Sequence, residues 1–180
     1  MQENAPFELL SRLRAEALEL AAQGLTYATQ SAGVKNIAYV VNGVNFYCDA
    51  SDIREVSVCE NLMVVPQTKT WMRGLVNSKG VLYSVTDLSL FAGFGRAIQT
   101  AKGHLLLLGD DAKQSSLLVN RVIGFRYFDD LDQVSDLEDK QEVLDGLSAF
   151  VDKAYHSDGQ DWFRLDVDKL LASEQFREVQ

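Results

Sequence analysis

Few side chains in this 180-residue chain are of the kinds that catalyse reactions or bind metals, and they are widely spaced. The two histidines, His104 and His156, have no second ligand at the short spacings typical of zinc sites, so both are expected to be structural. Cys48 and Cys59 stand eleven positions apart, which also fits no zinc site. In a reducing compartment we expect both thiols to be small buried side chains.

One acidic pair resembles a magnesium site. Asp110 and Asp111 follow the apolar run in "LLLLGDD", as the acids of a receiver domain do. Such a domain needs helices between its strands, whereas "AKQSSLLV" returns directly to a strand, so we interpret the pair as part of a hairpin turn. No "GxSxG" or "GxxxxGK" pattern occurs, and "AGFGRA" is interpreted as a helix end and a bend.

Composition narrows the function classes further. Apolar residues make up 47% of the chain, which is enough for a core in one domain or two small subdomains. A net charge of −9 repels nucleic acid and anionic lipid, so we expect no nucleic-acid partner. No apolar run approaches the roughly 20 residues of a bilayer span. The start "MQENAPFELL" does not resemble a secretory signal, so we expect a cytoplasmic protein without direct membrane insertion.

A helix is predicted over residues 7–22, where Leu10, Leu13, Ala17 and Leu20 recur at helical spacing. It either packs on the rest of the chain or docks a partner. Short strands follow. The dipeptide Asn42-Gly43 predicts a tight hairpin turn. Further strands are predicted in the segments "DIREVSV", "LMVVP", "VLYSV", "HLLLLG", "SLLVN" and "RVIGFRYF", the last with a bulge at Gly124.

The C-terminal part begins with the acidic segment 129–145, which is predicted to be a solvated loop with at most a weak helical turn. A closing hairpin around "SDGQ" and one terminal helix, starting at Asp166 or Asp168, are predicted next. Many short strands separated by turns favour a β-barrel or sandwich, and the lack of a βαβ rhythm disfavours a doubly wound sheet.

The region from Val65 to Leu88 resembles the signature of the CheW family of chemotaxis adaptors. The matching residues are Val65, Pro66, Gly74, Asn77, Lys79, Gly80, Asp87 and Leu88. Upstream, Ile53, Glu55 and Val56 match the family's "IxEV" segment, and the similarity spans about residues 34–172. The opening "PFELL", the segment "KTWMRGLVNSKG" and the C-terminal "FVDKAYHSDGQDWF" are most similar to the PilI-type adaptors of type IV pilus chemosensory systems.

This resemblance implies a mainly β fold of two small five-stranded SH3-like barrels packed together, with an N-terminal helix and a short C-terminal helix. It divides the chain into a helical extension (1–31), a CheW-like domain (32–176) and a tail (177–180). It implies a non-catalytic adaptor without cofactors or metals. Such a protein couples the cytoplasmic tip of a methyl-accepting chemoreceptor to the regulatory domain of a CheA-type histidine kinase, here in polar receptor arrays that control twitching motility.

Four residues of the motif are expected to be structural. Gly74 and Gly80 suit tight turns, Pro66 ends a strand, and Asp87 can cap a short helix ending at Gly93.

The partner-binding candidates are Ile53, Arg54, Glu55, Trp71, Arg73, Asn77 and Lys79. The position of Lys79 is usually arginine in the family and is thought to lie beside the acid that Glu55 matches; lysine keeps the charge but lacks the planar fork. Ile53 and Arg54 are candidates for contacting a receptor helix, with a core position for Ile53 as the alternative. Trp71 is either an anchor for a partner or part of the core. A small β-barrel enzyme and a nucleic-acid-binding barrel are the rival functions.

Overall fold

The computed structural model describes residues 34–109, 114–128, 133–134 and 140–178. The helix predicted over 7–22, the pair Asp110 and Asp111, and much of the acidic segment lie outside these ranges. Within them, no helix has the length and apolar character needed to cross a bilayer.

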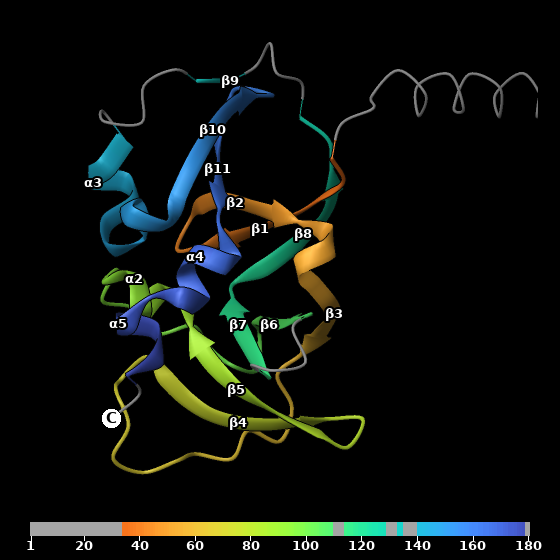
Figure 1. Cartoon of the computed structure of the whole chain (residues 1–180), viewed down its shortest axis with the longest axis vertical. Coiled ribbons are helices and arrows are strands. Elements are labelled where there is room, and N and C mark those ends of the chain that lie inside the picture. Colours follow the sequence, from red (N-terminus) through yellow and green to blue (C-terminus); the bar gives the residue numbers. More distant parts are fainter. Residues whose placement is uncertain (1–33, 110–113, 129–132, 135–139, 179–180) are drawn as a thin grey trace, which may run out of the picture. The chain divides into compact units, whose positions relative to one another are not determined.

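Two antiparallel-rich sheets make up the described fold (Figure 1). Sheet A has the strand order β8 (Arg121–Arg126), β1 (Asn36–Val41), β2 (Val44–Asp49), β11 (Gln160–Leu165), β10 (Val151–Ser157) and β9 (Gln133–Val134). Sheet B has the order β3 (Ile53–Val58), β6 (His104–Leu108), β7 (Ser115–Val119), β5 (Val81–Asp87) and β4 (Met72–Ser78). Each sheet contains one parallel pair, β11 with β2 and β5 with β7.

Tight turns set the register of the hairpins. Asn42 and Gly43 join β1 to β2 with φ angles of 49° and 86°, which confirms the predicted hairpin. Asp158 and Gly159 join β10 to β11 in the same way, with φ angles of 54° and 70°. Two successive positive φ angles fit the right-handed twist of the flanking strands. The predicted bulge in β8 is also present, because the β1–β8 register shifts next to Gly124.

The helices are short and lie beside the sheets. They are η1 (Ala50–Asp52), α2 (Leu88–Ala92), α3 (Gln141–Leu144), η4 (Asp145–Phe150), α4 (Val167–Ala172) and α5 (Glu174–Arg177). The helical turn allowed for in the acidic segment is α3. Asp166 caps α4 by accepting a hydrogen bond from the Lys169 amide. The single terminal helix predicted from the sequence is split, because Ser173 adopts an extended conformation and its hydroxyl caps α5 at Phe176.

One predicted strand is absent and another was missed. Of the segment "LMVVP", only Met63 pairs, in a single bridge to Leu75, and Val64 is 78% exposed. Its β-branched residues therefore lack the partner strand that strand propensity requires. Strand β4, in contrast, was not predicted, because Gly74 and Asn77 within it are residues typical of turns.

The mainly β, two-subdomain fold expected from the resemblance is confirmed, with two refinements. Sheet A has a sixth strand, the two-residue β9. Across the described ranges no backbone ladder joins β3 to β4, or β8 to β9, so both sheets curl around their interiors with an open seam.

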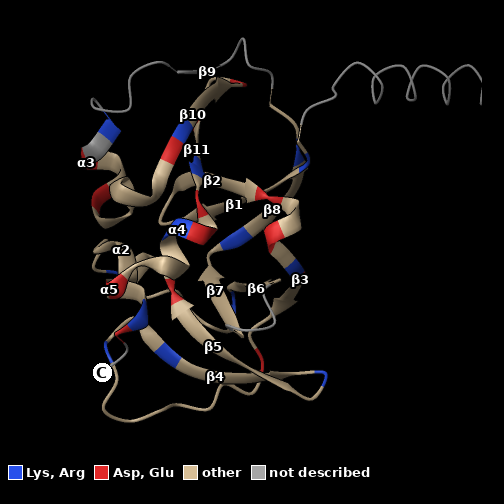
Figure 2. Ribbon diagram, in the orientation of Figure 1, with Lys and Arg blue, Asp and Glu red and all other residues tan. Residues whose placement is uncertain are grey.

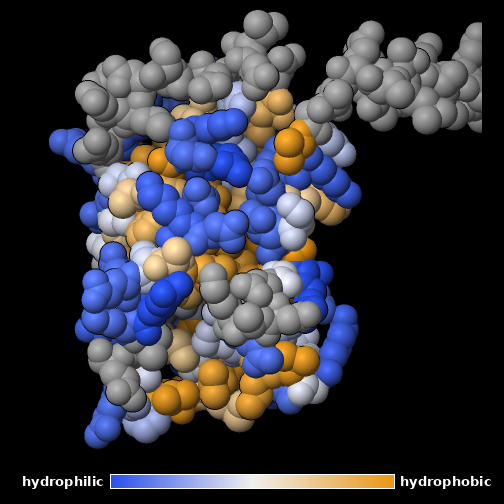
Figure 3. All heavy atoms as spheres, in the orientation of Figure 1, coloured by the Kyte–Doolittle hydropathy of each residue, from blue (hydrophilic) through white to orange (hydrophobic). Residues whose placement is uncertain are grey.

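The surface mixes charged and hydrophobic residues. Acidic and basic residues are distributed over strands and helices alike (Figure 2). Hydrophobic surface appears between them, notably along the lower edge over β4 and β5 (Figure 3). The exposed large hydrophobic residues are Val34, Val56, Val58, Met63, Val64, Leu82, Ile123, Phe125, Tyr127 and Val143.

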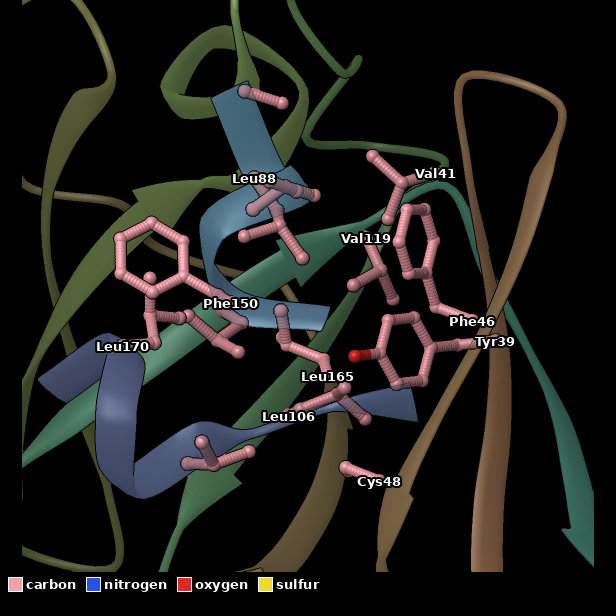
Figure 4. Close-up of a cluster of buried hydrophobic side chains, with 14 of the residues drawn as sticks. Tyr39, Val41, Phe46, Cys48, Leu88, Leu106, Val119, Phe150, Leu165 and Leu170 are labelled. Carbon is pink, nitrogen blue, oxygen red and sulfur yellow. The ribbon is translucent and has the colours of Figure 1, made fainter. Parts of the chain in front are cut away.

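Three hydrophobic clusters lie inside. The largest, here called the shared core, includes Tyr39, Phe46 and Leu165 from sheet A and Leu106, Leu117 and Val119 from sheet B. Figure 4 shows Tyr39 of β1 pointing toward Leu106 and Leu165, and Phe46 of β2 pointing toward Val41 and Val119. The other two clusters are smaller. One belongs to sheet B around Tyr83 and Leu107, and the other to sheet A around Tyr47 and Trp162.

The Tyr39 hydroxyl lies inside the shared core without a hydrogen-bond partner among the described residues. Burial raises the pKa of this phenol well above its usual range, so it stays neutral. An unpaired buried hydroxyl costs roughly 1–3 kcal/mol. We therefore expect Tyr39→Phe to raise the free energy of unfolding by about 1 kcal/mol in urea denaturation.

Tyr83→Phe is the control, because the Tyr83 side chain is also buried but its hydroxyl accepts a hydrogen bond from Arg54. We expect this change to lower stability instead. A loss of stability in Tyr39→Phe as large as that in Tyr83→Phe would contradict the assignment.

Candidate partner-binding surface

The tip of the β4–β5 hairpin presents a lysine to solvent. Lys79 and Gly80 form its two-residue turn, with φ angles of 51° and 87°. The Asn77 side-chain oxygen accepts a hydrogen bond of 2.9 Å from the Gly80 amide, which stabilises the turn. The Lys79 side chain remains 78% exposed.

Two side-chain contacts cross the open seam of sheet B. Lys79 Nζ lies 2.7 Å from Glu55 Oε2 on β3, so these residues are neighbours, as the resemblance implied. Beside them, Arg54 Nη1 donates to the Tyr83 hydroxyl of β5 at 3.2 Å. Each contact connects edge strand β3 to the β4–β5 hairpin. An exposed ion pair contributes under about 1 kcal/mol, so the Lys79–Glu55 pair orients the hairpin more than it stabilises the fold.

A comparable ion pair crosses from β8 to the β10–β11 hairpin in sheet A. Arg126 Nη2 lies 2.8 Å from Asp158 Oδ2. The Arg126 guanidinium also lies 4.2 Å from the centre of the Trp162 ring. Sequence reasoning missed this pair because 32 positions separate its members, and only the turn signal at Asp158 marked one of them.

Asp87 is the centre of a buried hydrogen-bond network. Its carboxylate is fully buried and caps α2 by accepting from the Ser89 and Leu90 amides, which confirms its predicted role. It also accepts from the Ile98 amide, and from Arg73 Nη1 at 2.8 Å. Arg73, one of the partner-binding candidates, pairs its guanidinium with this buried carboxylate, while 26% of its side chain stays exposed.

Ile53 and Trp71, two further candidates, lie in the shared core. Ile53 is buried, so the alternative of a core side chain applies to it. The Trp71 ring stacks on Phe176 with 6.1 Å between centroids and meets the edge of Phe91 at 5.3 Å. Neither side chain is available at the surface, whereas Arg54, Asn77 and Lys79 are exposed and Glu55 is half-buried.

Sequence reasoning missed the exposed apolar residues next to these candidates. On β3, Val56 and Val58 are 40% and 53% exposed. On β8, Ile123 and Phe125 are also exposed, and the Lys35 ammonium lies 3.6 Å from the centre of the Phe125 ring. We call Val56, Val58, Ile123 and Phe125 together the edge strip, because each is exposed on an edge strand of its own sheet, β3 in sheet B or β8 in sheet A.

Another apolar patch lies on the outer side of the β4–β5 hairpin. Leu82 of β5 is 45% exposed, and Met63 and Val64 lie where the preceding loop bridges to β4. We call Met63, Val64 and Leu82 the hairpin patch. Figure 3 shows hydrophobic surface along this edge of the molecule.

Gly74 allows that loop to approach β4. Its φ angle is 137°, and a Cβ atom here would lie 2.1 Å from the Met63 carbonyl oxygen. Only glycine fits such a close approach of two backbones. Pro66, in contrast, is exposed and lies in a turn rather than at the end of a strand.

The two histidines lie in different surroundings. The His156 ring lies 2.7 Å from one Asp161 oxygen, and Lys140 lies 2.7 Å from the other. Hydrogen bonds from His156 and Lys140 hold the pKa of Asp161 below its usual value. This histidine is paired, as expected, whereas the buried His104 Nδ1 has no hydrogen-bond partner in the described part of the chain.

The described residues show neither a reactive cysteine nor a metal-binding cluster. Cys48 and Cys59 are buried and unbridged, as expected, and loss of solvation raises the pKa of both thiols. A buried thiol with a raised pKa is a poor nucleophile. No cluster of three His, Cys, Asp or Glu residues that could hold a metal is found within the described residues.

Comparing alanine substitutions at Gly74 and Gly80 tests the close approach of the Met63 backbone to β4. Gly74→Ala must displace the Met63 backbone, so we expect it to lower the free energy of unfolding by more than about 3 kcal/mol. Gly80 also has a positive φ angle, but a Cβ atom there meets open space, so Gly80→Ala should cost about 1 kcal/mol. Equal losses for the two variants in urea denaturation would contradict the close approach at Gly74.

The chain is similar to known proteins in both sequence and fold. The model of the CheW-like domain family matches residues 37–175. Over 175 residues the chain is 25% identical to "Protein PilI" of Pseudomonas aeruginosa, a match covering 97% of this chain and 96% of that protein. The crystal structure of the scaffolding protein TtCheW from Thermoanaerobacter tengcongensis superimposes with a TM-score of 0.66 at 18% identity, covering 82% of this chain and 97% of TtCheW.

Proposed function

Because the chain belongs to the CheW-like domain family, we propose that it is a non-catalytic adaptor that couples a chemoreceptor to a CheA-type histidine kinase. The observation that carries this proposal is the exposed apolar surface beside the paired Lys79 and Glu55. Exposed apolar patches bordered by polar residues are typical of protein-binding sites.

The edge strip is the proposed site for the receptor. The cytoplasmic tip of a methyl-accepting chemoreceptor is helical, and an amphipathic helix binds by placing its apolar face on an apolar surface. Val56 and Val58 take over the role first proposed for Ile53, because they lie on the same strand and are exposed. Arg54 and Glu55 supply charges at its border.

The hairpin patch, with Lys79 and Asn77 at its end, is the proposed site for the kinase regulatory domain. Its apolar residues can be buried on binding, while the lysine adds charge at the rim. Each contact is expected to be modest on its own. Repetition of the complex in an array raises the overall strength of binding.

The similarity to PilI supports placement in a type IV pilus system that controls twitching motility. The adaptor then works in the cytoplasm, recruited to polar receptor arrays. In this proposal residues 32–176 form the adaptor domain, residues 1–31 a helical extension and residues 177–180 a tail.

Reversing the charge of Lys79 tests the kinase site. Lys79→Glu places two carboxylates together at the hairpin tip, so we expect at least a threefold weaker affinity for the regulatory domain of the cell's CheA-type kinase, measured by calorimetry. The exposed position should leave the fold intact by circular dichroism. The double exchange Glu55→Lys with Lys79→Glu restores the pair and should recover part of the affinity. Unchanged binding by Lys79→Glu would remove the hairpin tip from the interface.

The receptor site is tested by placing a charge in the edge strip. Val58→Asp should weaken binding of the receptor's cytoplasmic fragment at least tenfold, because a carboxylate would be buried against an apolar helix face. Val143→Asp is the matched control, since Val143 is 46% exposed and lies outside the strip, on α3. Equal binding by both variants would show that the edge strip is not the receptor site.

A further inference from the structure

The last described helix, α5, reaches from the end of sheet A to elements of sheet B. It follows α4, which itself follows β11 of sheet A. Figure 1 shows α5 beside α2, the helix that comes directly after β5 of sheet B. Phe176 is the buried side chain of α5 and is 7% exposed, whereas Glu174, Gln175 and Arg177 are exposed. A single apolar side chain therefore connects this helix to sheet B.

The Phe176 ring packs on two aromatic side chains, Trp71 and Phe91. It stacks on Trp71 with 17° between the ring planes, and it meets Phe91 edge-on with 5.7 Å between centroids. Both arrangements are favourable geometries for aromatic pairs. Phe91 also packs on Phe150 of η4 at 6.0 Å. The Trp71–Phe91 pair is therefore supported by the body of the fold independently of Phe176.

Hydrogen bonds hold α5 to α4 but not to the rest of the described fold. Ser173 bonds to the Leu170 carbonyl through both its amide and its hydroxyl, and Arg177 Nε donates to the Leu171 carbonyl. The backbone hydrogen bonds of the helix itself end on residues 173 and 174. Among the described residues, no hydrogen bond or ion pair joins α5 to any element other than α4. Because Ser173 is extended, α5 can move without unfolding α4.

We propose that α5 is a releasable C-terminal strap, and that the Trp71–Phe91 pair beneath it is a docking site for an aromatic side chain of a partner peptide. Phe176 shows the chemistry that this site accepts, which is a phenyl ring on a short helical segment with a hydroxyl cap three residues earlier. Tryptophan and its aromatic neighbours are common anchors of protein interfaces. A partner segment of this kind binds by displacing α5, and in its absence α5 keeps the site covered.

This site is separate from both surfaces proposed above. Trp71 directly precedes β4, and its carbonyl accepts a hydrogen bond of 2.8 Å from the amide of Asp87, the last residue of β5. The site therefore lies at the base of the β4–β5 hairpin, whereas Lys79 and Gly80 form the turn at its other end. Its test involves neither a receptor nor a kinase, so it can fail while the adaptor proposal holds.

Hydrogen exchange of the full chain tests whether α5 is releasable. After correction for intrinsic rates, we expect the amides of Phe176, Arg177 and Glu178 to exchange at least about tenfold faster than the Leu170 amide of α4, through a local opening that does not depend on urea below the unfolding midpoint. If the amides of α5 and α4 open together with the same urea dependence, α5 is an integral part of the core and the proposal is overturned.

Tryptophan quenching by acrylamide tests what lies beneath the strap. In Phe176→Ala the quenching constant should rise about twofold, because Trp71 is uncovered while Trp162 stays buried in its own cluster. Gln175→Ala is the matched control, since Gln175 is an exposed residue of the same helix, and it should keep the wild-type value. Unchanged quenching in Phe176→Ala, or loss of its folded near-ultraviolet circular dichroism, would contradict the proposal.

A peptide tests the docking site directly. The peptide SEQFRE, which has the sequence of residues 173–178, is added to Phe176→Ala at millimolar concentration, because a single anchoring side chain gives only weak binding. It should return the quenching constant to the wild-type value, whereas the same peptide with alanine in place of phenylalanine should have no effect. Failure of SEQFRE to protect Trp71 would remove the docking site. A wild-type dimer that Phe176→Ala abolishes would assign the site to α5 of a second copy and overturn the proposal of a separate partner.

Discussion

Neither sheet of this protein buries its hydrophobic residues alone, and the rest of the structure depends on the core that the two sheets share. The hydrophobic clusters that belong to one sheet alone are small. The shared core, in contrast, takes side chains from both sheets and from the helices α2, η4, α4 and α5. A single subdomain of this size would bury too little apolar surface to be stable by itself. We infer that the two subdomains fold together, with their relative position set by interlocking side chains such as Phe46, Leu106 and Leu165.

The polar residues inside the fold stabilise its body, whereas those that cross the open seams stay accessible to solvent. The Asp87 carboxylate accepts hydrogen bonds from Arg73, from the start of α2 and from the Ile98 amide. This residue of the family signature therefore stabilises the fold. The open seams, in contrast, are crossed by solvent-accessible ion pairs, Lys79 with Glu55 and Arg126 with Asp158. The proposed adaptor role needs surfaces whose mutual position does not vary, and a core shared by both sheets supplies that rigidity.

Local signals in the sequence predicted local structure well. The hairpin at Asn42-Gly43, the bulge near Gly124 and the caps at Asp87 and Asp166 follow from preferences of single residues, and all are present. The family signature also placed Lys79 beside Glu55. Burial on edge strands was less predictable, because Val56 and Val58 alternate as core residues do, yet no neighbouring strand covers them. The bond from Arg73 to Asp87 was missed for a similar reason, since it depends on how β4 pairs with β5.

The most direct test of the shared core is hydrogen exchange of the full chain at increasing urea concentration below the unfolding midpoint. If the shared core joins the subdomains into one cooperative unit, the most protected amides of β10 and β11 in sheet A and of β6 and β7 in sheet B will exchange through one global opening. They will then have the same opening free energy and the same urea dependence. A lower opening free energy for one sheet, while the other stays protected, would show that the subdomains are independent and would contradict this account.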